Sequence, residues 1–252
     1  SSRDEWQRNN NLNLGILTEE NPNLIDEWKM EIDSSMQQII VKANELRENY
    51  SQGKHEGVSH SKFRGTHYTR HLYNPLLYLS GGVNSVKISP EYLNEGEEEF
   101  VKDLQEFYDV KENRMIEHTM CLLRNQSKTG IGFFSAGNFF PDFIMWLIVE
   151  DHQYITFIDP KGLYHANSLK HPKISLSSNM SNITHDIRKR NNDQEITLNS
   201  FIISVTPKDG LGWGQELDKT AFTNSNVLFQ KDDKASYIKT MLQKIIPNIF
   251  PS

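Results

Sequence analysis

Two apolar stretches separated by a short polar turn decide the fold. They read Phe139-Phe-Pro-Asp-Phe-Ile-Met-Trp-Leu147 and Ile155-Thr-Phe-Ile-Asp-Pro-Lys161. Both are rich in the β-branched and aromatic residues that favour strands, and the turn between them is short, so the pattern predicts two antiparallel neighbours. Asp142 at the start of the first strand and Asp159 at the end of the second then meet at one end of the hairpin.

Outward from this hairpin, the hydrophobic spacing alternates between helical and strand periods. Helices are expected over residues 23–50, over residues 93–108 with Asn94 as the N-cap, before Arg190, and over 237–246; strands are expected over 115–123 and 196–205. This order predicts an α/β fold, with a mixed central sheet flanked by helices. We expect residues 1–70 to form an N-terminal helical and linker segment, and residues 71–252 to form the main domain.

Composition and charge narrow the function classes. The 252 residues carry 27 basic and 33 acidic side chains, a net charge of −6, and 37% of them are hydrophobic. Wholesale disorder is excluded, and the single cysteine, Cys121, excludes a disulfide framework. With no apolar run of membrane-spanning length and no signal-peptide pattern, we expect a cytoplasmic protein with no membrane partner.

The acidity is uneven along the chain and does not exclude a nucleic-acid partner. Residues 1–50 hold 10 acids against 5 bases, whereas residues 161–190 hold six bases against Asp186 alone. A basic surface is the usual electrostatic signature of DNA binding. The basic side chains expected to contact nucleic acid are Arg124, Lys170, Lys173, Arg188, Lys189 and Arg190. For Arg124 the alternatives are to orient Asp142 or to form a structural salt bridge, and for residues 188–190 the alternative is a solvated helix end.

The hairpin end brings together residues that suit phosphodiester hydrolysis. Two close carboxylates repel each other unless a cation neutralises them, and Mg²⁺ binds one or two carboxylates together with phosphate oxygens and water. Lys161 shares a strand face with Asp159 and is placed to position the water or to offset charge on phosphorus. The alternative is two turn-flanking aspartates and a solvated lysine. Aspartate is disfavoured in strands, however, and Pro160 costs a ladder hydrogen bond at this end.

With these residues the chain resembles the PD-(D/E)xK superfamily of restriction-endonuclease-like nucleases, with Asp142, Asp159 and Lys161 filling the signature. Longer blocks are similar to the C-terminal nuclease region of bacterial DEAD/DEAH-box helicase proteins that resemble type III restriction subunits. These blocks are His71–Leu77, Ile88–Pro90, Leu93–Glu97, Phe100–Leu104, Leu122–Asn125, Gly132–Phe134, Phe140–Ile144 and Phe157–Gly162.

The resemblance implies a restriction-endonuclease-like core that cleaves DNA with Mg²⁺, or with Mn²⁺ as a substitute. Asp142 and Asp159 would bind the metal, and Lys161 would act on the water. The parent protein would be a helicase–nuclease of restriction or phage defence. The chain contains no GxxxxGK[ST] phosphate loop, so we expect a helicase or ATPase domain elsewhere in the same longer chain as a partner.

The family pattern often adds a glutamate from the helix before the first strand, and Glu97 is the matching position. It precedes Phe100 and Val101 by three and four residues, so it lies along the buried stripe of that helix. The alternative is a capping box in which Glu97 reaches back to Asn94. Glu98 is the reserve candidate for the helix carboxylate.

Two other functions compete with a nuclease. One is a catalytically silent nuclease-fold module that binds nucleic acid or docks partner domains. The complete Asp–Asp–Lys set speaks against that reading. The other is an unrelated zinc enzyme that uses the histidines of residues 55–71. His67 and His71 would have ligand spacing if they were helical, but no third ligand is evident, and ordinary loop histidines are the simpler interpretation.

Overall fold

The computed structural model describes residues 27–110, 113, 115–133, 136, 139–164, 166–190, 195–234 and 236–250, except for the side chain of Arg190. The chain divides into two compact units, residues 1–99 and residues 100–252. The first unit therefore extends beyond the expected N-terminal segment of residues 1–70. Helix α3 (Glu95–Asp109) begins in the first unit and continues in the second.

The first unit contains one long helix and two small antiparallel sheets in its described part. Helix α2 (Gln37–Ser51) packs on a three-stranded sheet of order β2-β3-β4, whereas β1 pairs with β5. The strands are β1 (Lys29–Ile32), β2 (Val58–Ser59), β3 (Phe63–Thr66), β4 (Leu76–Leu79) and β5 (Val86–Ser89). Side chains from both layers, including Ile39, Leu46 and Phe63, form the core of this unit.

The helix expected over residues 23–50 is wrong in its first half. Residues 23–26 lie outside the described part, and the segment that follows forms β1 before α2 begins at Gln37. Trp28, Met30 and Ile32 are apolar at every second position, which is the strand period, and all three pack against the core of the unit. Trp28 and Ile32 are also four residues apart, so a helical stripe fits the same residues.

The second unit is built on a five-stranded mixed sheet of order β10-β9-β8-β7-β6. Strands β6, β7 and β8 are antiparallel neighbours, and β8, β9 and β10 are parallel. The strands are β6 (Thr119–Arg124), β7 (Phe143–Val149), β8 (His152–Lys161), β9 (Ile196–Ser204) and β10 (Val227–Phe229). The predicted hairpin and the mixed sheet are confirmed, although β6 and β7 begin four residues later than the hydrophobic pattern indicated.

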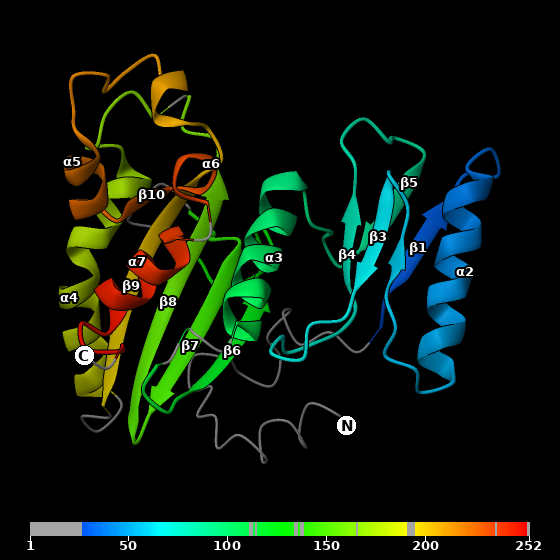
Figure 1. Ribbon diagram of the computed structural model, residues 1–252, viewed down its shortest axis with the longest axis horizontal. Helices are drawn as coiled ribbons and strands as arrows, with labels where there is room; N and C mark the ends of the chain where they lie inside the picture. Colours follow the sequence, from blue (N-terminus) through cyan, green and yellow to red (C-terminus); the bar gives the residue numbers. More distant parts are fainter. Residues whose placement is uncertain are drawn as a thin grey trace. The chain divides into compact units, whose positions relative to one another are not determined.

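Helices flank this sheet, as Figure 1 shows, with α4 alongside β9 and α7 in front of the strands. The long crossover helix α4 joins the parallel strands β8 and β9 and has Pro172 at its first position, where a missing N–H costs nothing. The Tyr237 hydroxyl of α7 donates to the Asp103 carboxylate of α3 at 2.7 Å. The bounds are α4 (Pro172–Arg190), α5 (Lys219–Asn224), α6 (Gln230–Asp233) and α7 (Ser236–Ile245), with a short 3-10 helix at Lys208–Gly210.

A membrane span would need a long, apolar helix, and the described residues contain none that meets both conditions.

Candidate active site

The strand register brings Asp142 and Asp159 together. The last pair between β7 and β8 is Phe143 with Ile158, so the next residue on each side is one of the two aspartates. Strand β8 continues beyond this pair and keeps β9 as its neighbour, with Asp159 opposite Ile202. Pro160 lies in this extension, beyond the last pair with β7, where a sheet tolerates proline more readily. The predicted meeting of the carboxylates is confirmed.

Asp159 is a buried acid whose charge the described residues leave incompletely compensated. The residue is 3% exposed, and its Oδ2 atom is buried without a hydrogen bond from any described residue. Burial raises the pKa of Asp159 well above its usual range, and the charge and contact of the Asp142 carboxylate raise it further, against the opposing charges of Lys173 and Lys161. A carboxylate can only accept hydrogen bonds, so contact between two ionised acids satisfies neither oxygen.

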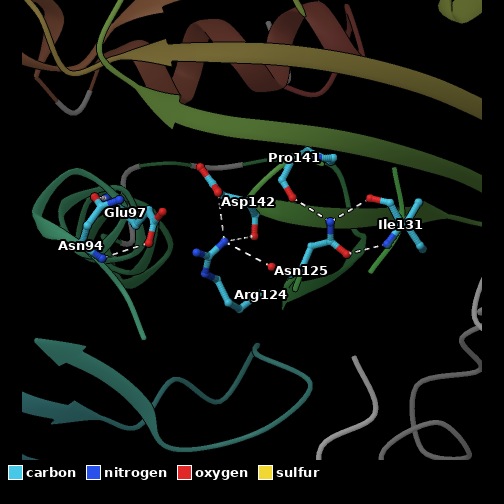
Figure 2. Close-up of polar contacts among 7 residues, drawn as sticks. All are labelled: Asn94, Glu97, Arg124, Asn125, Ile131, Pro141 and Asp142. Carbon is cyan, nitrogen blue, oxygen red and sulfur yellow. Dashed lines mark hydrogen bonds and ion pairs between the residues drawn. The ribbon is translucent and has the colours of Figure 1, made fainter. Parts of the chain in front are cut away.

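Arg124 positions the other carboxylate, as Figure 2 shows. It ends β6, and its Nη1 atom donates to the Asp142 backbone oxygen at 2.8 Å and to Asp142 Oδ1 at 3.2 Å. The Arg124 side chain is 3% exposed, whereas that of Asp142 is 22% exposed. A buried guanidinium holds Asp142 in place and offers little surface to DNA. The alternative in which Arg124 orients Asp142 is therefore the one that the contacts favour.

Asn125, which sequence reasoning missed, fixes the backbone next to Asp142 (Figure 2). Its buried amide donates to the carbonyl oxygens of Ile131 at 2.9 Å and Pro141 at 2.7 Å, and its Oδ1 atom accepts from the Ile131 N–H at 2.9 Å. Its own N–H donates to the Asp142 oxygen at 2.8 Å. Gly130 passes so close to this amide that a Cβ atom there would collide with it. In the sequence, the signal was an asparagine that directly follows a buried strand.

Two lysines reach the aspartates from separate elements. Lys161 ends β8, and Lys173 is the second residue of α4; their side chains lie close together. Burial lowers the pKa of Lys161, but contact with Lys173 and the charges of Asp159 and Asp142 together raise it above its ordinary value. Burial and the contact with Lys161 lower the pKa of Lys173. Lys173, which was predicted to contact nucleic acid, therefore lies beside Lys161 and the two aspartates.

Of the other basic residues predicted to contact nucleic acid, the structure describes the side chains of Lys170, Arg188 and Lys189. Lys170 and Lys189 are exposed. Arg188 donates from Nε to the Ile196 carbonyl at 2.7 Å and pairs with Glu195 at 3.5 Å, so it ties the end of α4 to the start of β9. The side chain of Arg190 lies outside the description. Only the contacts of Arg188 favour a structural role; for the exposed lysines, DNA binding stays a prediction.

Glu97 and Glu98 are both buried in the first unit. Glu97 forms the predicted capping box: its Oε2 atom accepts from the Asn94 N–H at 2.9 Å, and its own N–H donates to Asn94 Oδ1 at 3.1 Å (Figure 2). The reserve candidate Glu98 accepts two hydrogen bonds from the Arg64 guanidinium. Metal binding by Glu97 stays a prediction, and the alternative capping role is confirmed.

The histidines of residues 55–71 do not form the zinc site weighed above. His67 and His71 lie in the non-helical segment after β3; His67 hydrogen-bonds to the Tyr50 hydroxyl at 2.9 Å and stacks on His55. Among the described residues, no group of three or more histidine, cysteine, aspartate or glutamate side chains could hold a metal ion.

The aspartate pair suits a hard cation that takes its remaining ligands from water and substrate. The buried Oδ2 atom of Asp159 receives no hydrogen bond from the described residues, and the two acids repel each other; a divalent ion would relieve both. Mg²⁺ characteristically uses one or two carboxylates and keeps several water molecules. The two aspartates therefore fit Mg²⁺ better than a zinc centre, which needs three or four protein ligands.

The first unit also contains a cavity that the sequence did not reveal. It measures about 420 Å³ and lies between β1, α2 and the segment before β4, and it is lined by Trp28, Met30, Ile32, Ala43, Asn44, Leu46, Arg47, Tyr50, Asn74, Pro75 and Leu77. The lining is mainly apolar and contains no acid, so it shares no chemistry with the aspartate pair.

No family model, curated protein or solved structure matches the chain.

Proposed function

We propose that the chain is a metal-dependent endonuclease that hydrolyses DNA phosphodiester bonds with Mg²⁺, or with Mn²⁺ in its place. The observation that carries this proposal is the pairing of the buried acid Asp159 with Asp142 at the end of a strand hairpin, beside two lysines. A purely structural acid at this depth would be expected to have a cationic or hydrogen-bonding partner for each oxygen.

Each side chain has a distinct task in this proposal. Asp142 and Asp159 hold the metal, and Arg124 keeps Asp142 oriented through contacts to both its backbone and its carboxylate. When bound, the metal polarises the phosphoryl oxygen and lowers the pKa of water. Lys161 positions the attacking water and offsets the negative charge that develops on the phosphate oxygens, because its ammonium group lies beside the acids. Glu97 is the further carboxylate proposed from the resemblance.

The wider setting of the reaction is proposed on the resemblance. The chain would be the nuclease domain of a cytoplasmic helicase–nuclease that acts in restriction or phage defence, with the helicase or ATPase domain in the same longer protein. The basic side chains Lys170 and Lys189 would contact the DNA backbone, since both are exposed.

The test uses matched aspartate substitutions on one hairpin. Asp142→Asn and Asp159→Asn change the proposed metal ligands, and Asp151→Asn changes an exposed aspartate in the turn at the opposite end. Cleavage of supercoiled plasmid and of single-stranded DNA is measured with Mg²⁺ and with Mn²⁺. We expect Asp142→Asn and Asp159→Asn to lose cleavage while Asp151→Asn retains it. Full activity in Asp159→Asn would show that the assignment is wrong.

The rival is the catalytically silent module, and the same preparations separate it from the nuclease. A silent module binds DNA without cleaving it under every metal condition, and Asp159→Asn leaves its DNA affinity unchanged. The contacts of Asp159 favour the nuclease, because a module without a metal gains nothing from a buried acid whose Oδ2 atom receives no hydrogen bond from the described residues.

A further inference from the structure

We propose that Lys173 is a second catalytic lysine, which with Lys161 forms a two-lysine clamp on the scissile phosphate. This inference rests on the proposed phosphodiester hydrolysis. It assigns to Lys173 a direct contact with the reacting group, whereas the sequence indicated a general contact with the nucleic-acid backbone.

Lys173 lies where three elements of the second unit meet. Its side chain contacts that of Lys161, and both lie close enough to Asp142 and Asp159 to feel their charges. The Lys173 Nζ atom also lies 4.7 Å from the centre of the buried Phe139 ring. Strand β8, helix α4 and the segment before β7 therefore converge on one ammonium group. A lysine held in this way has lost much of the side-chain freedom of a solvated one.

The local charges indicate an anion as the missing partner. Three cations, Arg124, Lys161 and Lys173, face two carboxylates, and Arg124 is already engaged with Asp142. Two ammonium groups in contact repel each other, and that repulsion is relieved when an anion lies between them. A divalent ion on the aspartates would make the surroundings more positive still. A phosphodiester supplies the negative charge, and its non-bridging oxygens accept hydrogen bonds from both lysines.

The stability of α4 does not explain why a lysine lies at position 173. Lys173 lies in the first turn of α4, where the helix dipole disfavours a cation, and no acid shares that turn to offset it. The neighbouring His171 cannot supply a negative charge, and burial and the charges of Lys173 and Lys161 lower its pKa, which favours its neutral form. The same helix end favours a bound phosphate. Lys173 is thus placed where it costs stability in the free protein and becomes favourable when an anion is bound.

The test compares Lys173→Met and Lys173→Arg with a matched control, Lys170→Met. Lys170 lies three residues earlier, is exposed, and was also predicted to contact DNA. In plasmid cleavage with Mg²⁺, we expect Lys173→Met to lower kcat by about 100-fold or more with little change in KM, which is the scale for losing one donor to a developing charge. Lys173→Arg should recover part of the rate. Lys170→Met should instead raise KM and leave kcat unchanged, because Lys170 is proposed to contact the DNA backbone away from the reacting phosphate. Equal, KM-dominated losses in Lys173→Met and Lys170→Met would overturn the proposal.

A second measurement keeps this inference separate from nuclease activity. Melting temperatures are recorded with EDTA, with and without inorganic phosphate. We expect Lys173→Met to melt above the wild type in the absence of phosphate, and phosphate to raise the melting temperature of the wild type and of Lys170→Met but not that of Lys173→Met. This pattern supports the anion clamp even if no DNA is cleaved. If phosphate raises the wild type and Lys173→Met equally, or has no effect on the wild type, the clamp is wrong.

Discussion

Glu98 in the first unit and Asp159 in the second are both buried acids, 4% and 3% exposed, but their surroundings differ. The Glu98 carboxylate accepts two hydrogen bonds from Arg64, and that guanidinium lies 3.9 Å from the centre of the Tyr78 ring. Asp159 faces a second carboxylate, and its Oδ2 atom has no donor among the described residues.

The difference is the one expected between a structural charge and the functional charge that we propose for Asp159. The Arg64 guanidinium donates a hydrogen bond to each oxygen of the Glu98 carboxylate. This ion pair therefore links β3 to the first turn of α3 and is not available to a ligand. The Oδ2 atom of Asp159 receives no hydrogen bond from the described residues, and we propose that it is kept for a metal ion, since active sites often hold groups at a cost in stability. The proposed roles of these two buried acids are opposite, so substitutions at the two positions should have opposite effects on the free energy of unfolding.

The largest effect on stability is expected from breaking the ion pair between Arg64 and Glu98. Arg64→Leu removes the guanidinium that binds both oxygens of the buried Glu98 carboxylate, and the loss of one member of a buried ion pair costs about 3–5 kcal/mol. The free energy of unfolding, measured in urea by tryptophan fluorescence and circular dichroism, should fall by that amount. The double substitution Arg64→Leu with Glu98→Leu should regain most of the loss, because it removes both charges. A double variant as unstable as the single one would contradict a paired-charge explanation.

The next largest effect is expected from a metal ion at the proposed site of Asp142 and Asp159. A ligand that binds only the folded state stabilises it by RT ln(1 + [L]/Kd), about 2.7 kcal/mol at a hundredfold excess over Kd. Mn²⁺ should therefore raise the melting temperature of the wild type, and should fail to do so in Asp142→Asn and Asp159→Asn. Asp151→Asn, in the turn between β7 and β8, serves as the control and should respond as the wild type does. Equal stabilisation of all four proteins would place the ion elsewhere.

A smaller effect, of opposite sign to that at Arg64, is expected for the metal-free protein. Asp159→Asn removes the buried charge and supplies an amide that can donate to the Asp142 carboxylate, so the folded state should gain about 1–3 kcal/mol. For a chain of this size that corresponds to about 2–4 °C in melting temperature for each kcal/mol. The variant would then be more stable and inactive. A lower melting temperature in EDTA would show that Asp159 stabilises the fold, as Glu98 does.

Sequence reasoning succeeded where the signal is local. The hairpin that joins Asp142 to Asp159 and the capping box of Asn94 with Glu97 depend on residues close together in the chain, and both are present. It failed for β1, because the apolar residues there fit both the helical and the strand spacing. It also could not predict that Lys173 returns to Lys161, because that contact depends on how α4 packs after the loop that follows β8.

The smallest effect is the change in unfolding free energy from one pH value to the next. It tests whether the ionised Asp159 side chain destabilises the folded protein. Burial and then Asp142 raise the pKa of Asp159 in the folded state, so the folded protein holds this proton at pH values where the unfolded chain, with a pKa of about 3.9, has released it. This contribution to stability is complete below that unfolded value and is lost as the pH rises through the folded value, by at most about 1.4 kcal/mol per pH unit. In EDTA, the stability advantage of Asp159→Asn over the wild type should therefore be small near pH 4 and grow towards neutral pH. The measurement is the difference in unfolding free energy between the two proteins from pH 4 to pH 8. A difference that stays constant over this range would mean that the amide acts through packing and that the charge of Asp159 is not the cause.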